Sequence, residues 1–161
     1  GRNGSLDLDK IDIGPSGNIY VSAMSQNLIL KYDANGNLLS YWPVSEESGF
    51  ANKVSIFVSP LGSVYARVWA ETVKKLDLNG NLQATLDVEG SVFGDTSGNI
   101  YLAGNPYLYK FDSNDNFVKK WTITIGVAGC GVTNPMIIAP NNVVYGRTCP
   151  DGNNVGKFTL E

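Results

Sequence analysis

Short runs of alternating apolar and polar residues, separated by turn-forming residues, follow one another along the whole chain. The segment IDIGPSGNIYVSA at 11–23 shows the pattern: an apolar run, a Pro-Ser-Gly-Asn turn and a second, alternating run. Alternation places successive side chains on opposite faces of a β-strand, whereas no segment has the spacing of an amphipathic helix. The pattern predicts an all-β protein.

This segment has three further copies in the sequence. They are SIFVSPLGSVYAR at 55–67, SVFGDTSGNIYLA at 91–103 and MIIAPNNVVYGRT at 136–148. Each copy carries a tyrosine in its second run, and the intervals between Tyr20, Tyr65, Tyr101 and Tyr145 are 45, 36 and 44 residues. A period of about 40 residues that contains several short strands is typical of a β-propeller blade.

A second repeated segment completes the blade pattern. KYDANGNLLSYW at 31–42 returns as KLDLNGNLQATL at 75–86 and as KFDSNDNFVKKW at 110–121. Each copy is typical of a third strand, a tight turn and a fourth strand. We therefore predict a β-propeller of four four-stranded antiparallel blades in a single domain over 1–161. The repeats are placed at 11–44, 55–88, 91–123 and 136–161.

The turns that begin with Asp33, Asp77 and Asp112 resemble the oxygen-rich start of a calcium loop. A calcium loop needs further acidic ligands, including a bidentate one, but here an apolar strand follows at once. Asn-Gly supplies the positive φ angles of a hairpin turn, and the aspartate side chain caps it. We expect hairpin turns, with no metal and no cofactor.

The aromatic residues also occupy repeat positions. A tyrosine at the same place in four strands predicts packing between blades, with each hydroxyl reaching a polar partner. Trp42 and Trp121 stand at equivalent ends of fourth strands and are assigned the same structural role. Trp69 has no such equivalent.

The last blade lacks its fourth strand. The chain ends in KFTLE, in which Lys157, Phe158, Thr159 and Leu160 form a third strand. When KFTLE is followed by the N-terminal GRNGSLDLDK and aligned with KLDLNGNLQATL, Asn3-Gly4 falls at the hairpin turn. Segment 1–8 then supplies the missing strand through its residues Ser5, Leu6, Asp7 and Leu8.

Three arrangements would complete this blade. The N-terminal strand could close the ring of its own chain, or two chains could close a larger ring. Alternatively, the strand could pair with the next chain or with a neighbouring module of a longer protein, which builds an open array or a fibre. Because an open sheet edge invites pairing, we expect closure or assembly, with copies of the chain or adjacent modules as partners.

The phrase SGNIYV, a variable loop and LILKYDANGNLL together resemble an NHL-type β-propeller repeat. The resemblance covers nearly the whole chain; the fourth copy has PNN in place of PSG and lacks its last strand. It implies a propeller fold. It leaves function open, since such propellers serve as binding platforms, structural modules and, less often, lyases.

Composition narrows the class of partner. The chain is 43% hydrophobic and only 17% charged, which excludes a disordered chain. The net charge is -3 and no basic cluster stands out, so nucleic acid is not expected as a partner. No apolar run approaches the length of a membrane-spanning helix, so we expect no membrane insertion. Low charge with many Gly, Asn, Ser and Thr favours an extracellular or cell-surface location.

The two cysteines are Cys130 and Cys149. Cys130 lies in the connection to the fourth blade and Cys149 in a loop of that blade, so both are expected on the same face. We predict a disulfide, which would suit an extracellular location. Two buried thiols are the alternative.

Loops between second and third strands gather on that same face, where a binding site on a propeller would most naturally lie. The candidate ligand-binding residues there, suited to a glycan or a peptide, are Arg67, Trp69, Asn105, Tyr107, Arg147 and Asp151. The aromatic side chains would stack on a sugar or peptide ring. Scattered surface residues without a common ligand are the alternative interpretation.

Two classes of function follow. The chain has no histidine, which excludes histidine-based triads and histidine-ligated metals. Carboxylates such as Glu46 and Asp151, with Tyr107, leave a lyase or a glycan-active enzyme as the alternative. We favour a non-catalytic extracellular structural or interaction module that assembles by strand completion, because no acidic cluster recurs in the repeats.

Overall fold

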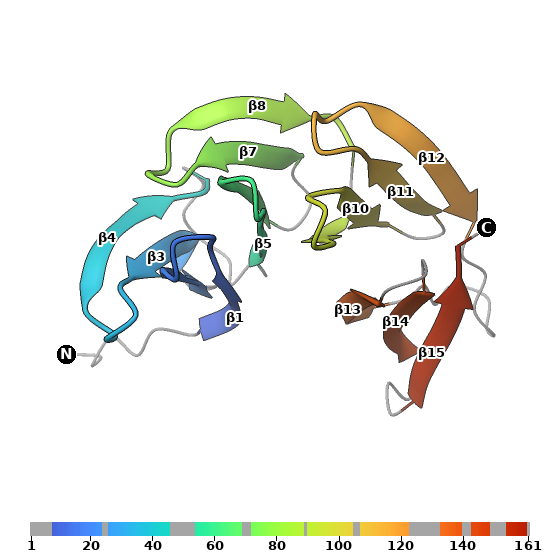
Figure 1. Ribbon diagram of the computed structural model, residues 1–161, viewed down its shortest axis with the longest axis horizontal. Helices are drawn as coiled ribbons and strands as arrows, with labels where there is room; N and C mark the ends of the chain where they lie inside the picture. Colours follow the sequence, from blue (N-terminus) through green and yellow to red (C-terminus); the bar gives the residue numbers. More distant parts are fainter. Residues whose placement is uncertain are drawn as a thin grey trace. The chain divides into compact units, whose positions relative to one another are not determined.

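The computed structural model describes residues 8–23, 26–45, 54–68, 72–88, 90–104, 107–122, 133–139, 143–148 and 154–160. These residues form fifteen β-strands in four antiparallel sheets. Within each sheet the strands lie side by side in chain order (Figure 1). The repeat pattern of the sequence is confirmed at the level of strands and sheets. The described part of the chain has no helix that is long and apolar enough to cross a membrane.

The first two sheets lie in residues 1–88, which form one compact unit. The first sheet contains β1 (Leu8–Ile13), β2 (Ile19–Ala23), β3 (Leu28–Tyr32) and β4 (Leu38–Pro43). The second sheet contains β5 (Val54–Val58), β6 (Ser63–Val68), β7 (Val73–Asp77) and β8 (Leu82–Leu86). Both sheets have the four-stranded meander that the sequence predicts.

Residues 89–161 form a second compact unit, which holds the other two sheets. The third sheet contains β9 (Ser91–Gly94), β10 (Ile100–Ala103), β11 (Tyr107–Phe111) and β12 (Phe117–Thr122). The fourth contains β13 (Thr133–Ala139), β14 (Val143–Thr148) and β15 (Asn154–Thr159). Within the described ranges the fourth sheet therefore has three strands, and Lys157 to Thr159 belong to its third strand, as predicted.

The assignment of Leu8 to the missing fourth strand is wrong. Leu8 begins β1 and pairs with Ala23 of β2, because β1 starts three residues earlier than the predicted first strand at Ile11. A β-bulge after Leu8 restores the register at Lys10. The remaining residues assigned to the completing strand, Ser5, Leu6 and Asp7, lie outside the described residues.

Six hairpins share one turn geometry. In each, the first turn residue donates its N–H to the carbonyl of the fifth, and the fourth donates to the carbonyl of the first, over 2.7–3.1 Å. The fourth residue has a positive φ, which glycine adopts at little cost. These residues are Gly17, Gly36, Gly62, Gly80, Gly98 and, without a glycine, Asp115. The sequences Gly-Pro-Ser-Gly-Asn at 14–18 and Asp-Ala-Asn-Gly-Asn at 33–37 thus form the same turn.

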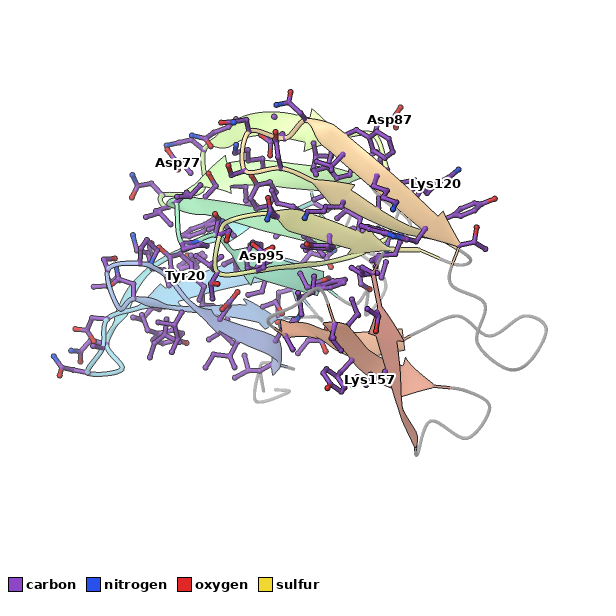
Figure 2. All side chains as sticks on the ribbon, turned by 45° about the vertical axis from the view of Figure 1, so that its right-hand side comes forward. Tyr20, Asp77, Asp87, Asp95, Lys120 and Lys157 are labelled. Carbon is purple, nitrogen blue, oxygen red and sulfur yellow. The ribbon has the colours of Figure 1, made fainter. Side chains whose placement is uncertain are left out.

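An aspartate caps four of these turns. Asp77 accepts hydrogen bonds from the N–H groups of Asn79 and Asn81 and from the Asn81 side chain, over 2.8–2.9 Å. Asp33, Asp95 and Asp112 make the same three contacts, and Figure 2 labels Asp77 and Asp95. The carboxylates therefore cap these turns, which confirms the hairpin interpretation.

Candidate interaction surface

The first and second sheets pack against each other through a shared buried cluster. Tyr20, Ile29 and Trp42 of the first sheet share a buried cluster with residues of the second. Those residues are Val54, Ile56, Val58, Val64, Ala66 and Leu76, with Leu78 packed against them. The side of the first sheet that carries Tyr20 thus meets the side of the second that carries Ile56 and Val58. We call these sides the tyrosine face and the opposite face.

Three polar contacts join the same two sheets. The Val58 N–H donates to Asp12 Oδ2 over 2.7 Å. Lys31 Nζ donates to the Leu78 carbonyl over 2.9 Å, and Lys74 Nζ donates to the Val44 carbonyl over 2.6 Å. Hydrogen bonds with one charged partner contribute roughly 1.5–3 kcal/mol each. They also fix the register of one sheet on the next.

Trp42 packs directly on the turn of the neighbouring sheet. A Cβ atom built on Gly80 would lie 2.5 Å from the Trp42 ring. Gly80 also has φ +91°, so the turn requires glycine here for its conformation and for the close approach of the ring. Trp42, to which the sequence assigns a structural role, therefore lies in the contact between the two sheets.

A lysine lies over the repeat tyrosine in each of the first three sheets. Lys31, Lys75 and Lys110 pair across the sheet with Tyr20, Tyr65 and Tyr101, with Nζ 5.8, 5.5 and 5.4 Å from the ring centres. Such cation–π contacts contribute about 0.5–1 kcal/mol at partly exposed sites. In the fourth sheet Tyr145 pairs with Lys157 in the same register, and Figure 2 labels Tyr20 and Lys157.

The second unit repeats the packing scheme of the first. Tyr101, Leu108 and Trp121 of the third sheet pack with residues of the fourth. Those residues are Ile138, Val144 and Leu160. Leu160 follows Lys157 at the same interval as Leu78 follows Lys75, so both play one role. In both units, the tyrosine face of one sheet packs against the opposite face of the next.

The tyrosine hydroxyls do not all have the polar partner that the sequence predicts. Burial, with the nearby charge of Asp95, raises the pKa of Tyr101, whose hydroxyl donates to Asp95 Oδ2 over 3.3 Å. Burial also raises the pKa of Tyr20, but its hydroxyl has no hydrogen-bond partner among the described residues. Gly14 takes the place of Asp95 in the first sheet, and a Cβ there would lie 2.9 Å from the Tyr20 ring.

The opposite face of the first sheet is exposed along β1. Ile11 and Ile13 flank Asp12, the register partner of Tyr20, as Ile56 and Val58 flank Phe57, the partner of Tyr65. Ile56 and Val58 are 1% and 3% exposed, whereas Ile11 and Ile13 are 65% and 64% exposed. Leu8, brought to the same face by the bulge, is 58% exposed. We call these three residues, Leu8, Ile11 and Ile13, the β1 strip.

Comparison with known proteins supplies the fold. No protein-family model matches the sequence, and a search of curated proteins found no match. A protein of unknown function from Bacteroides caccae superposes with a TM-score of 0.64 and 17% identity, over 87% of this chain and 55% of that one. BamB from Moraxella catarrhalis gives 0.63 and 12%, over 92% and 45%. A catalytically inactive virginiamycin B lyase from Staphylococcus aureus, solved with quinupristin, gives 0.69 and 10%, over 99% and 57%.

Similar structures such as BamB and virginiamycin B lyase are β-propeller-like. The chain has a β-propeller fold. Its four sheets are propeller blades, and within each unit the packing of a tyrosine face on the next sheet is contact between blades. The chain spans about half the length of the neighbours described above, at 45–57% of each. At these identities the likeness concerns the fold alone.

Three of the six candidate ligand-binding residues lie within the described part of this propeller. Arg67 lies in β6 and Arg147 in β14, and Tyr107 begins β11, so all three are strand residues. Trp69, Asn105 and Asp151 lie outside the described residues, as do Glu46, Cys130 and Cys149.

Tyr107 is engaged with its own blade. Its ring lies 6.0 Å from the ring of Tyr109 in an edge-on arrangement, and Lys120 Nζ lies 4.2 Å from its centre. A sugar or peptide ring that stacked on Tyr107 would have to compete with Lys120 for the ring face. Among the described residues, no group of three or more His, Cys, Asp or Glu side chains gathers into a metal site. Among the exposed apolar residues, Ile11 and Ile13 of the β1 strip are notable because their counterparts Ile56 and Val58 are buried in a contact between sheets.

Sequence reasoning did not find the β1 strip. Isoleucine at 11 and 13 fits the repeat pattern as well as Ile56 and Val58 do. Alternation shows which face of a strand is apolar, but burial depends on what covers that face. The exposure of Ile11 and Ile13 therefore becomes visible only in the structure.

Proposed function

We propose that this chain is a non-catalytic, extracellular propeller module of the NHL type whose activity is assembly through its blades. The β1 strip supports the proposal most directly. Its apolar side chains are exposed, whereas the side chains at the equivalent positions of the second blade are buried against the first blade. A strip with this geometry is suited to dock the tyrosine face of another blade.

The energetic argument rests on area removed from water. Full burial of an isoleucine or leucine side chain contributes about 1.5–3 kcal/mol. The β1 strip has three such side chains, each more than half exposed. The combined gain is of the size that offsets the entropic cost of association.

Strand completion is the second part of the proposal. Within the described residues, β15 pairs with β14 on one side only, so Asn154–Thr159 presents an unpaired edge. We propose that Ser5, Leu6 and Asp7 add to this edge in a neighbouring copy, by β-strand addition. Leu8 lies in β1, so the donated segment is shorter than the sequence suggested.

The extracellular location is proposed from the composition and from the predicted Cys130–Cys149 disulfide. Peptide mapping of the protein secreted from an oxidising compartment, with and without reductant, tests the disulfide. Two free thiols in that material would contradict it.

The assembly proposal is tested by measuring the molar mass of the protein in solution by light scattering. The double variant Ile11→Asp, Ile13→Asp places charge in the β1 strip and is expected to lose the assembled species. Leu82→Asp is the matched control, because Leu82 is 61% exposed on the outer strand β8. An unchanged mass for the double variant would overturn the proposal, provided that circular dichroism shows both variants folded.

A further inference from the structure

We propose that Asn35 is a site of spontaneous covalent modification, at which the side-chain amide is converted through a cyclic imide to aspartate and isoaspartate. The proposal goes beyond the assembly function and does not depend on it. Asn-Gly occurs in the sequence at 3–4, 35–36 and 79–80. The first pair lies outside the described residues, so the structure compares the other two.

The reaction joins the asparagine side chain to the backbone nitrogen of the residue that follows. The Gly36 nitrogen gives its proton to water and attacks Asn35 Cγ. A bond forms between these two atoms, and the Cγ–Nδ2 bond breaks as ammonia leaves with a proton taken from water. Glycine favours this ring closure because it has no side chain to hinder its nitrogen.

Water then opens the imide ring at one of its two carbonyls. Breaking the new bond between the Gly36 nitrogen and Cγ gives aspartate, whereas breaking the original peptide bond to Gly36 gives isoaspartate. The net change is hydrolysis of an amide to a carboxylate and ammonium, so the reaction needs no oxidant, reductant or cofactor.

The two turns hold the attacking nitrogen in the same way. The Gly36 N–H donates to the Asp33 carbonyl and the Gly80 N–H donates to the Asp77 carbonyl, each over 3.1 Å. This hydrogen bond must break before the nitrogen can react, so modification requires the turn to open. The aspartate caps are also the same in both turns. The relative rates therefore depend on what else resists local opening.

The turn that contains Asn35 is open to solvent. It joins β3 to β4 (Figure 1), and Asn35 and Gly36 are both exposed. No atom of another residue, apart from the two chain neighbours, lies within 4 Å of a Cβ built on Gly36. The hydrogen bonds that opening must break here lie within the turn itself. We therefore expect this turn to open at low cost.

The equivalent turn of the second sheet is held by the first sheet. The Trp42 ring packs on Gly80, and Trp42 itself is buried. The Leu78 carbonyl accepts a hydrogen bond from Lys31 Nζ over 2.9 Å, and the Leu78 side chain packs against the buried cluster. Opening this turn would disrupt contacts between sheets as well as those of the turn. Asn79 is therefore protected although it is exposed.

Either product changes the turn in which it forms. Aspartate at 35 adds a negative charge close to that of Asp33, and isoaspartate also lengthens the backbone of the turn by one carbon. Because the turn sets the register of the β3–β4 hairpin, isoaspartate should loosen β4, the outer strand of the first sheet. The charge and the order of this hairpin then change with the age of the molecule.

Incubation of the folded protein in mildly alkaline buffer tests the proposal. Mass spectrometry of digested samples follows the conversion of amide to acid at Asn35 and Asn79, and chromatography separates aspartate from isoaspartate. Asn35 is expected to react roughly tenfold faster than Asn79, or more, which corresponds to about 1.4 kcal/mol of extra opening free energy at Asn79. Peptides that cover 31–42 and 75–86 are the controls and should react at similar rates.

A variant tests the cause of the protection. Trp42→Ala removes the ring from Gly80 and should raise the rate at Asn79 toward that at Asn35. Trp121→Ala, at the equivalent position of the third sheet, is the matched control and should leave both rates unchanged. Circular dichroism checks that each variant is folded, and the wild-type comparison stands without them. An Asn35 that stays intact in the folded protein while its peptide reacts would overturn the proposal. Equal rates at the two sites in the folded wild type would overturn the protection of Asn79.

Discussion

At the scale of the residue, the aspartate-capped turn is the most regular feature of the chain. Each carboxylate accepts three hydrogen bonds, two from backbone N–H groups and one from an asparagine side chain. The side-chain hydrogen bond of the asparagine is the main cause that lowers the pKa of Asp33, Asp77 and Asp112. The sequence predicted three of these caps. The fourth, Asp95, was missed because its turn, Asp-Thr-Ser-Gly-Asn, reads as a different motif.

Replacing Asp77 with asparagine should lower the thermal stability of the protein near neutral pH. A carboxyl whose pKa is lower in the folded state stabilises above its unfolded pKa, near 3.8, and loses this contribution as the pH falls through the folded value. The difference in Tm between wild type and Asp77→Asn is therefore expected to be largest at pH 6 and to shrink at pH 2. Calorimetric melts measure it, with Asp87→Asn, an exposed aspartate after β8, as control. An equal difference at both pH values would show that the charge of Asp77 does not matter.

Two glycines in equivalent turns separate backbone strain from crowding. Gly36 and Gly80 have φ +84° and +91°, so alanine at either costs about 1–2 kcal/mol of backbone strain. Nothing lies within 4 Å of a Cβ on Gly36, whereas a Cβ on Gly80 would strike the Trp42 ring. Gly80→Ala should therefore destabilise by a further ~1–3 kcal/mol in urea unfolding. Equal losses of unfolding free energy for Gly36→Ala and Gly80→Ala would contradict the contact between Trp42 and Gly80.

At the scale of the strand, the type and order of the elements follow from the sequence, but their exact lengths do not. The bulges after Lys31, Lys75 and Lys110 illustrate the limit. The five-residue turn sets the register of the hairpin, and the bulge next to it shifts the pairing by one residue. Alternation alone predicts continuous pairing there. The pairing of each lysine with its tyrosine lies between the second and third strands, where the register is continuous, so these bulges do not affect it.

Asp12 is a test of the contact between two blades at this scale. Its carboxylate accepts the N–H of Val58, a residue that is almost fully buried, so Asp12→Ala leaves that N–H without its partner. An unsatisfied buried donor costs about 1–3 kcal/mol. Asp9→Ala, an exposed aspartate of the same strand, is the matched control and should cost much less. Chemical denaturation with both variants would contradict the assignment if their free energies of unfolding were equal.

At the scale of the whole molecule, four similar repeats were enough to predict four antiparallel sheets. The predicted ligand face stays a prediction: Arg67, Tyr107 and Arg147 lie in strands, Lys120 lies over the Tyr107 ring, and the other three candidates lie outside the described residues. Assembly is a property of faces, and a face is buried or exposed according to its neighbour. Ile11 and Ile56 are both isoleucines at the same repeat position, yet Ile11 is exposed and Ile56 is buried. No pattern within one repeat could distinguish them.

Removing residues 1–7 separates the two contacts that the proposed assembly uses. The deletion leaves β1 from Leu8 onward, and so preserves the β1 strip, but removes Ser5, Leu6 and Asp7, which are proposed to pair with the edge of β15. If strand addition contributes, the deletion should weaken self-association while each chain stays folded, since the added strand would supply backbone hydrogen bonds along one sheet edge.

Leu6→Pro makes the same test without shortening the chain, because proline removes one backbone donor and disfavours central pairing. Leu6→Val is its matched control and should behave as wild type. Dissociation constants from sedimentation equilibrium compare the variants. If the deletion and Leu6→Pro both leave the dissociation constant unchanged while Ile13→Asp raises it, blade stacking is sufficient and strand donation is wrong. A larger effect of Leu6→Pro than of Ile13→Asp would instead make the β15 edge the principal contact.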